Sequence, residues 1–111
     1  KKLIKIFKIK KNFKSSEYIY TILINKNKDQ QLRDKLIQFL KKNKINTTVH
    51  YIPLFELKFY KDKFSKKKFP NTNYVYKNIV SLPFHNKLKL NQVKYISNKI
   101  NDFFNYENKK K

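Results

Sequence analysis

The chain has 111 residues and a formal net charge of +21 at pH 7, and 40% of its residues are hydrophobic. This length suits one small domain, and the absence of cysteine excludes disulfides, thiolate metal sites and thiol nucleophiles. No apolar run approaches the roughly 20 residues of a membrane-spanning helix, and the basic start lacks the features of a signal peptide, so we expect a cytoplasmic protein without a membrane span.

The first part of the chain predicts a strand followed by a helix. Residues 1–14 mix lysine with apolar residues, and their periodicity leaves a short strand, a basic amphipathic helix and a connector open. Residues 17–24 are rich in β-branched and aromatic side chains, which favours a strand. In the following turn, Asn27 and Gln30 resemble a capping box. Residues 29–43 then predict a helix. One face of it collects Leu32, Leu36, Phe39 and Leu40, with Ile37 beside them.

A second strand is predicted over residues 45–52, closed by Pro53 because proline cannot donate to a strand ladder. Alternation predicts two faces. One carries Ile45, Thr47, Val49 and Tyr51, and the other carries Asn46, Thr48, His50 and Ile52. Residues 54–64 predict a short helical or irregular excursion before a basic loop.

The last part of the chain predicts a short helix that starts at Pro70, a brief strand over residues 80–84 that ends with Pro83, and a helix over residues 91–104. The apolar face of that last helix holds Val93, Ile96, Ile100, Phe103 and Phe104. A frayed tail is expected after it. This order predicts an α/β or α+β fold in which helices pack on a short sheet.

The high positive charge has two interpretations. Lys, Asn, Ile, Phe and Tyr abound while Gly and Ala are absent, which is typical of A/T-rich coding sequence. Arg33 is the only arginine, although arginine is preferred for bidentate contacts to bases and phosphates, and the lysines are spread along the whole chain. We therefore expect a solvated surface and no specific nucleic-acid partner. A basic nucleic-acid-binding module that uses lysine and exposed aromatic rings is the alternative.

Four ordered blocks carry a resemblance to a known family. They are "YIYTILI", "LRDKLIQFLKKNKINTTVHYIPL", "KFPNTNYVYKNIVSLPFHNKL" and "VKYISNKINDFF". Over residues 16–104 they resemble the C-terminal part of the DegT-type nucleotide-sugar aminotransferases, and the blocks "VHYIPL" and "SLPFHNKL" at this separation are the specific part. The form "VHYIP" looks most like transaminases that make UDP-4-amino-4,6-dideoxy sugars, as in the pseudaminic acid pathway.

The resemblance implies the small C-terminal domain of the aspartate-aminotransferase fold over residues 16–105. Residues 1–15 would be a connector from a larger domain, and residues 106–111 a basic tail. In this family the larger domain holds pyridoxal 5′-phosphate (PLP) on a lysine. The enzyme transfers an amino group, usually from glutamate, to a nucleotide-linked keto-sugar for polysaccharide or glycan biosynthesis, typically as a homodimer. The motif context of that lysine is absent here, so we expect the chain alone to be inactive.

The sequence departs from the family pattern at several positions. Lys44 stands where the family carries glycine before the second strand, and Asn43 is expected to supply the left-handed turn instead. Phe55 replaces a histidine of the loop that faces the active site, Asn73 replaces a glutamate, and Lys89 replaces the Thr or Ser that begins the last helix. These departures raise an inactive gene remnant as a further alternative.

His50 and Tyr51 are the candidate substrate-binding residues, because the resemblance places them at a strand end that leads into the substrate loop. A neutral imidazole and a phenol can both hydrogen-bond sugar or phosphate oxygens, although a structural role for His50 is equally compatible with the pattern.

The other polar and aromatic residues are expected to be structural. His85 is expected to be exposed in a turn, Ser81 lacks an adjacent base, and the two histidines have no clustered carboxylate to form a metal site. Tyr18 and Tyr20 are expected to pack within a strand, and Phe103 and Phe104 in the core.

Overall fold

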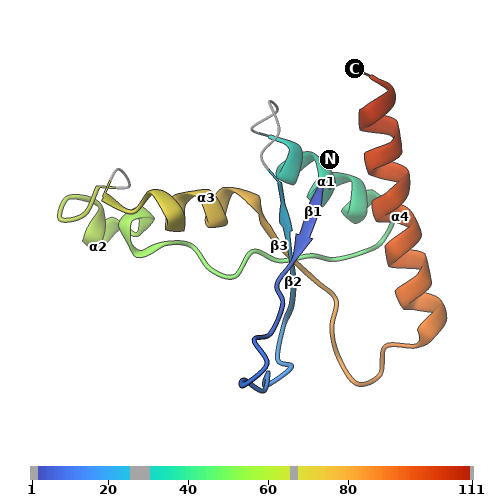
Figure 1. Ribbon diagram of the computed structural model, residues 1–111. Coiled ribbons are helices and arrows are strands. Elements are labelled where there is room, and N and C mark those ends of the chain that lie inside the picture. The colour runs from blue at the N-terminus through green and yellow to red at the C-terminus, as the bar shows by residue number, and fades with distance from the viewer. Residues whose placement is uncertain (1–2, 26–30, 66–67, 111) are drawn as a thin grey trace.

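The computed structural model describes residues 3–25, 31–65 and 68–110. In chain order the elements are β1 (Ile4–Ile6), β2 (Tyr20–Ile24), α1 (Leu32–Lys42), the 3-10 helix η1 (Leu54–Glu56), α2 (Lys58–Lys61), α3 (Pro70–Asn78), β3 (Ile79–Leu82) and α4 (Leu90–Lys109). The described strands form one antiparallel sheet in the order β1-β2-β3 (Figure 1). The expected class, helices packed on a short sheet, is confirmed in its α+β form.

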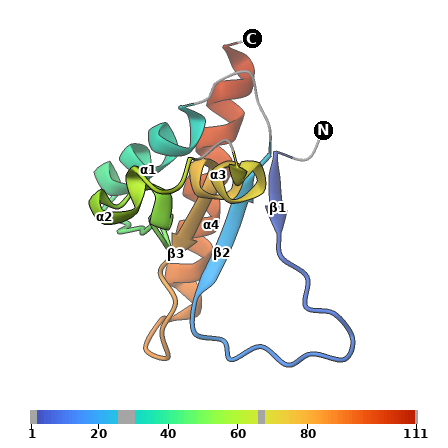
Figure 2. The ribbon, with the colours of Figure 1, turned by 90° about the vertical axis from the view of Figure 1, so that its left-hand side faces the viewer.

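The N-terminal segment contributes a strand to the sheet. β1 pairs with β2 in the register Ile4↔Ile24 and Ile6↔Ile22, so the short strand is the alternative that the structure adopts. A long exposed loop joins the two strands (Figure 2). The strand predicted from residue 17 begins only at Tyr20, because Glu17 has a left-handed φ of 51° that interrupts extended backbone. The predicted capping box at residues 27 and 30 lies outside the described residues.

The expected strand packing of the two tyrosines is half right. Tyr18 precedes β2 and is 75% exposed, so its predicted packing is wrong. Tyr20 lies in β2, and its ring centroid is 6.1 Å from that of Phe84.

The core lies between one face of the sheet and the helices α1 and α4, while α3 and the short helices extend on the opposite side (Figure 1). Strand alternation sends every second side chain into this core. The predicted helix faces supply its other side, and Phe103 and Phe104 are buried as expected. The buried core residues are Ile22, Ile24, Leu32, Leu36, Leu40, Ile45, Val80, Ile96, Ile100, Phe103 and Phe104.

The end of α1 shows which residue takes the left-handed conformation. Lys44 has φ 59°, whereas Asn43 has φ −91°, so the expectation that Asn43 supplies this turn is wrong. The backbone N–H groups of Ile45 and Lys44 donate to the carbonyls of Leu40 and Lys41 at 2.9 and 3.0 Å, which is the Schellman pattern. In this pattern the residue at the Lys44 position must be left-handed, whichever side chain it bears.

α4 is longer than predicted. It begins at Leu90 and runs to Lys109, because residues 105–109 contain neither glycine nor proline to end it. At the start of the helix the Lys89 ammonium cannot accept a capping hydrogen bond, but the Lys89 N–H donates to Gln92 Oε1 at 2.9 Å. Within the described residues, no helix is both long and apolar enough to cross a membrane.

The second predicted strand is wrong as a strand. Within residues 45–52, all of which the structure describes, one bridge forms, between Thr48 and Ser81. The next hydrogen-bonded pairs would involve Pro83 and Ile79 of the opposing segment. Pro83 has no N–H, and the N–H of Ile79 already donates to the Val75 carbonyl at the end of α3. The segment therefore leaves the sheet on both sides of Thr48.

Candidate functional site

A cavity of about 360 Å³ lies where residues 50–53, helix α3 and the start of β3 meet. Both candidate substrate-binding residues line it, so the structure brings His50 and Tyr51 to one cavity with side chains that are distant in sequence. The lining residues are His50, Tyr51, Pro53, Asn71, Thr72, Val75, Tyr76 and Ile79.

His50 is held by a residue of β3. Its Nδ1 lies 2.8 Å from the hydroxyl Oγ of Ser81, 31 residues further along the chain. The expectation that Ser81 lacks an adjacent base is therefore wrong. Ser81 is only 3% exposed, however, and a nucleophile must reach its substrate, so the geometry gives it a structural part.

Tyr51 brings a phenol to the cavity, and no hydrogen bond of its hydroxyl is found among the described residues. The residue is 69% exposed, and its ring meets the His50 ring edge-on with centroids 4.8 Å apart. The peptide bond between the two residues is cis. A phenol at the rim of a cavity can donate or accept one hydrogen bond without first leaving a partner.

The far wall of the cavity is α3, which starts at Pro70 as predicted. Asn71 and Thr72 in its first turn present amide and hydroxyl groups, while Val75 and Tyr76 add apolar surface. Sequence reasoning missed all four. The available signal was the Pro70 start of a helix next to the strand that carries Ser81, but neither feature shows which face of the helix lines a cavity.

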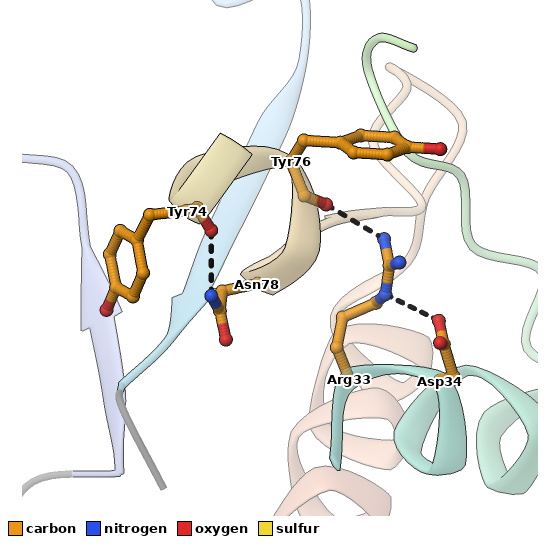
Figure 3. A network of polar contacts seen from close by, with 5 residues as sticks. All are labelled: Arg33, Asp34, Tyr74, Tyr76 and Asn78. Carbon is orange, nitrogen blue, oxygen red and sulfur yellow. Dashed lines mark hydrogen bonds and ion pairs between the residues drawn. The ribbon is translucent and has the colours of Figure 1, made fainter. Parts of the chain in front are cut away.

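Arg33 of α1 reaches the C-terminal end of α3 (Figure 3). Its Nη1 donates to the carbonyl oxygen of Tyr76 at 3.1 Å, and its guanidinium carbon lies 5.8 Å from the Tyr76 ring centroid. Its Nε forms an ion pair with Asp34 at 2.6 Å. In the same view, Asn78 Nδ2 donates to the Tyr74 carbonyl at 2.7 Å. The single arginine of the chain thus joins α1 to the last turn of α3.

Phe55, expected in a loop facing the active site, is buried instead. It is 6% exposed and stacks on Phe69 with centroids 6.0 Å apart and planes 8° from parallel. Phe64 meets Phe69 edge-on at 6.3 Å. These rings give the segment around η1 and α2 a small apolar centre of its own, and Phe55 does not line the cavity.

The remaining predicted positions lie away from the cavity. His85 is exposed in the loop after β3, as expected, and borders a separate apolar groove between the sheet and α4. Asn73 is half-buried, and its N–H donates to the Phe69 carbonyl. Among the described residues, no group of three His, Cys, Asp or Glu side chains could hold a metal ion.

The cavity does not fit PLP by itself. Formation of an aldimine requires a lysine, and a protonated pyridine nitrogen requires a carboxylate. Of the described residues that line the cavity, none is lysine, aspartate or glutamate. Its donors are instead an imidazole, a phenol, an amide and a hydroxyl beside an apolar wall, which suits an oxygen-rich polar ligand.

Several solved structures that share this arrangement of sheet and helices are aminotransferases. One is a protein of Streptococcus pneumoniae assigned as a sugar aminotransferase, in its PLP form, with a TM-score of 0.78, 30% sequence identity and coverage of 87% of this chain and 25% of that chain. Another is an aminotransferase of Helicobacter pylori involved in pseudoaminic acid biosynthesis, with a TM-score of 0.70, 26% identity and coverage of 79% and 24%. The fold is therefore part of the PLP-type aminotransferase fold.

The chain belongs to the DegT/DnrJ/EryC1/StrS aminotransferase family, whose model matches residues 2–101. It is 43% identical over 82 residues to an uncharacterized protein of Methanocaldococcus jannaschii, covering 72% of this chain and 21% of that protein. It is 34% identical over 89 residues to the UDP-4-amino-4,6-dideoxy-N-acetyl-β-L-altrosamine transaminase of Campylobacter jejuni, covering 80% and 23%. The chain thus spans less than a quarter of the length of these curated relatives.

Proposed function

We propose that this chain is the small C-terminal domain of a PLP-dependent nucleotide-sugar aminotransferase, and that it forms one wall of the sugar-nucleotide site. The observation that carries the proposal is the cavity in which His50 and Tyr51 meet the first turns of α3. In this proposal PLP and its lysine belong to a larger domain outside the chain. Glutamate as amino donor and a homodimer are further parts of the proposal that follow from the family resemblance.

The residues of the cavity would bind and orient the substrate. The Tyr51 hydroxyl and the His50 ring nitrogen that is not bonded to Ser81 would hydrogen-bond oxygens of the sugar or of the phosphates, which is supported by the position of both residues in the cavity lining. Val75, Ile79 and Pro53 would exclude water from the apolar side of the ligand. The likeness to the Campylobacter transaminase supports a UDP-linked 4-amino-4,6-dideoxy sugar as the product, and therefore its 4-keto counterpart as the substrate.

A hybrid enzyme tests this function. Residues 1–111 would replace the matching segment of the Campylobacter transaminase, and the hybrid would be assayed with that enzyme's own nucleotide-sugar. We expect activity, and we expect Tyr51→Phe to raise KM for the nucleotide-sugar about tenfold, which is the size of one hydrogen bond of about 1–1.5 kcal/mol. The PLP absorbance should not change, because the substitution removes only a hydroxyl at the substrate wall.

Tyr18→Phe is the matched control. Tyr18 is 75% exposed and lies outside the cavity, so removal of its hydroxyl should leave KM for the nucleotide-sugar unchanged. Equal KM values for the two variants would remove Tyr51 from the site. A hybrid that folds, binds PLP and fails to turn over would favour the inactive gene remnant.

A further inference from the structure

Ser81 is the one polar residue in the buried set of the described chain, at 3% exposure. Both backbone groups of Ser81 take part in the isolated bridge, since its N–H donates to the Thr48 carbonyl at 2.8 Å and its carbonyl accepts from the Thr48 N–H at 3.1 Å. The hydroxyl is therefore the remaining hydrogen-bond donor of Ser81. Its partner among the described residues is His50 Nδ1, at 2.8 Å.

The direction of this hydrogen bond follows from burial. A hydroxyl has one donor and two acceptor sites, and a buried donor without a partner is more costly than an unused acceptor lone pair. If Nδ1–H donated to Oγ, the Ser81 proton would have no acceptor within the described structure. If the hydroxyl donates to Nδ1, both groups are satisfied. The second arrangement requires the neutral imidazole to carry its proton on Nε2.

We propose that Ser81 is a positioning residue that fixes the orientation and the tautomer of His50, so that Nε2–H is presented as a hydrogen-bond donor to the ligand of the cavity. The inference rests on the proposed function for the identity of that ligand, but the coupling between the two side chains does not. It also specifies the ligand atom, which must be an acceptor such as a phosphate, carbonyl or hydroxyl oxygen.

The orientation depends on the tertiary structure. Ser81 sits at the point where β3 pairs with Thr48, and Thr48 lies two residues before His50. The bridge fixes the distance between the two backbones, and the hydroxyl then fixes the ring. No other hydrogen bond of the His50 ring is found among the described residues, so removal of the hydroxyl should free the ring to rotate.

Nitrogen NMR on the complete chain tests the coupling directly. The chain has two histidines, and the exposed His85 serves as an internal reference that His85→Gln assigns. Long-range proton–nitrogen correlations at alkaline pH should show the Nε2–H tautomer for His50. Its Nδ1 signal should be displaced from that of His85 by the hydrogen bond. Ser81→Ala should move the Nδ1 signal to the His85 position, and Ser81→Thr, which keeps a hydroxyl, should restore it.

Thr21→Ala serves as the control variant. Thr21 pairs with Ser81 across β2 and β3, and no hydrogen bond between Thr21 and His50 is found among the described residues, so Thr21→Ala should leave both signals in place. An Nδ1–H tautomer in the unsubstituted chain, or an Nδ1 signal that Ser81→Ala does not move, would overturn the proposal. The first of these measurements needs no Ser81 variant, so a Ser81→Ala chain that fails to fold does not remove the test.

The hybrid enzyme separates this inference from the proposed function. There, Ser81→Ala should raise KM for the nucleotide-sugar about three- to tenfold with kcat unchanged. In a hybrid that already carries His50→Ala, Ser81→Ala should cause no further rise in KM. If the NMR coupling is present and KM does not change, Ser81 positions His50 but His50 does not bind the nucleotide-sugar.

Discussion

Lys44 shows how a single residue can occupy a backbone position that favours glycine. Its φ of 59° completes the Schellman end of α1 and turns the chain toward Ile45, which is 4% exposed and lies in the core. A side chain with a Cβ costs about 1–2 kcal/mol in the left-handed region. Glycine avoids this cost, although it loses about 0.5–1 kcal/mol more conformational entropy on folding.

We therefore predict that Lys44→Gly stabilises the domain, by up to about 1 kcal/mol, because the steric relief exceeds the added entropy cost. Urea unfolding should show a higher midpoint with an unchanged slope. The comparison is Lys41→Gly in the last helical turn, where the backbone is right-handed and glycine should destabilise by about 0.5–1 kcal/mol. A lower midpoint for both variants would show that the left-handed position carries no strain.

Between elements, Arg33 is the contact that sets α3 against α1. The last carbonyls of a helix have no partner within the helix, and the Arg33 guanidinium supplies one at Tyr76. The Arg33 side chain is 12% exposed, whereas its ion-pair partner Asp34 is 58% exposed. The exposed carboxylate contributes little to stability, so the bond to the carbonyl is the stronger part of this contact.

We predict that Arg33→Met, which keeps the apolar stem, loosens α3. A hydrogen bond from a charged group contributes about 1.5–3 kcal/mol to stability. Because the methionine side chain keeps part of the apolar packing of the Arg33 stem, we expect a loss of about 1–2 kcal/mol. Native-state hydrogen exchange should show that the substitution lowers the protection of α3 more than that of α4, relative to the unsubstituted chain. Lys42→Met, at an exposed position of the same helix, should leave both helices unchanged. Equal loss of protection in α3 and α4 would mean that Arg33 supports the whole fold instead of the cavity wall.

As a whole, the molecule is more extended than a typical domain of its size. Its radius of gyration is 15.7 Å, against about 13 Å for a compact domain of about 100 residues. The loop between β1 and β2 and the arm formed by residues 54–65 and 68–78, which include η1, α2 and α3, both project from the core (Figures 1 and 2). The arm exposes large apolar side chains, among them Leu54, Leu57 and Phe59. Such surface supports the proposal that the rest of an aminotransferase covers this chain.

At this scale we predict that the chain alone does not form a PLP site. The lining of the cavity contains no lysine among its described residues, and the other described lysines are spread over solvated surface. Borohydride reduction after addition of PLP should therefore label many lysines at low yield, as peptide mass spectrometry would show. The hybrid enzyme is the positive control, with one lysine labelled stoichiometrically. One stoichiometric pyridoxyl-lysine in the isolated chain would contradict the assignment of PLP to another domain.

The sequence by itself determined the features that depend on neighbouring residues. The apolar stripe of α1, the start of α3 at Pro70 and the family blocks around "VHYIPL" and "SLPFHNKL" could be found in this way, because periodicity, proline geometry and motif spacing are local properties. The same motif selected His50 and Tyr51 as candidates, whereas strand alternation predicted opposite faces for them and the folded chain brings both to one cavity.

The tertiary structure alone decided what depends on partners that are distant in the chain. Residues 45–52 have the alternation of a strand, but the donors needed for a ladder are missing at Pro83 and already used at Ile79. The hydrogen bond between His50 and Ser81, the support of α3 by Arg33 and the burial of Phe55 each join residues that no local pattern relates. A pattern records which side chains a segment offers, whereas the competition among segments for hydrogen bonds and apolar contacts decides which of them meet.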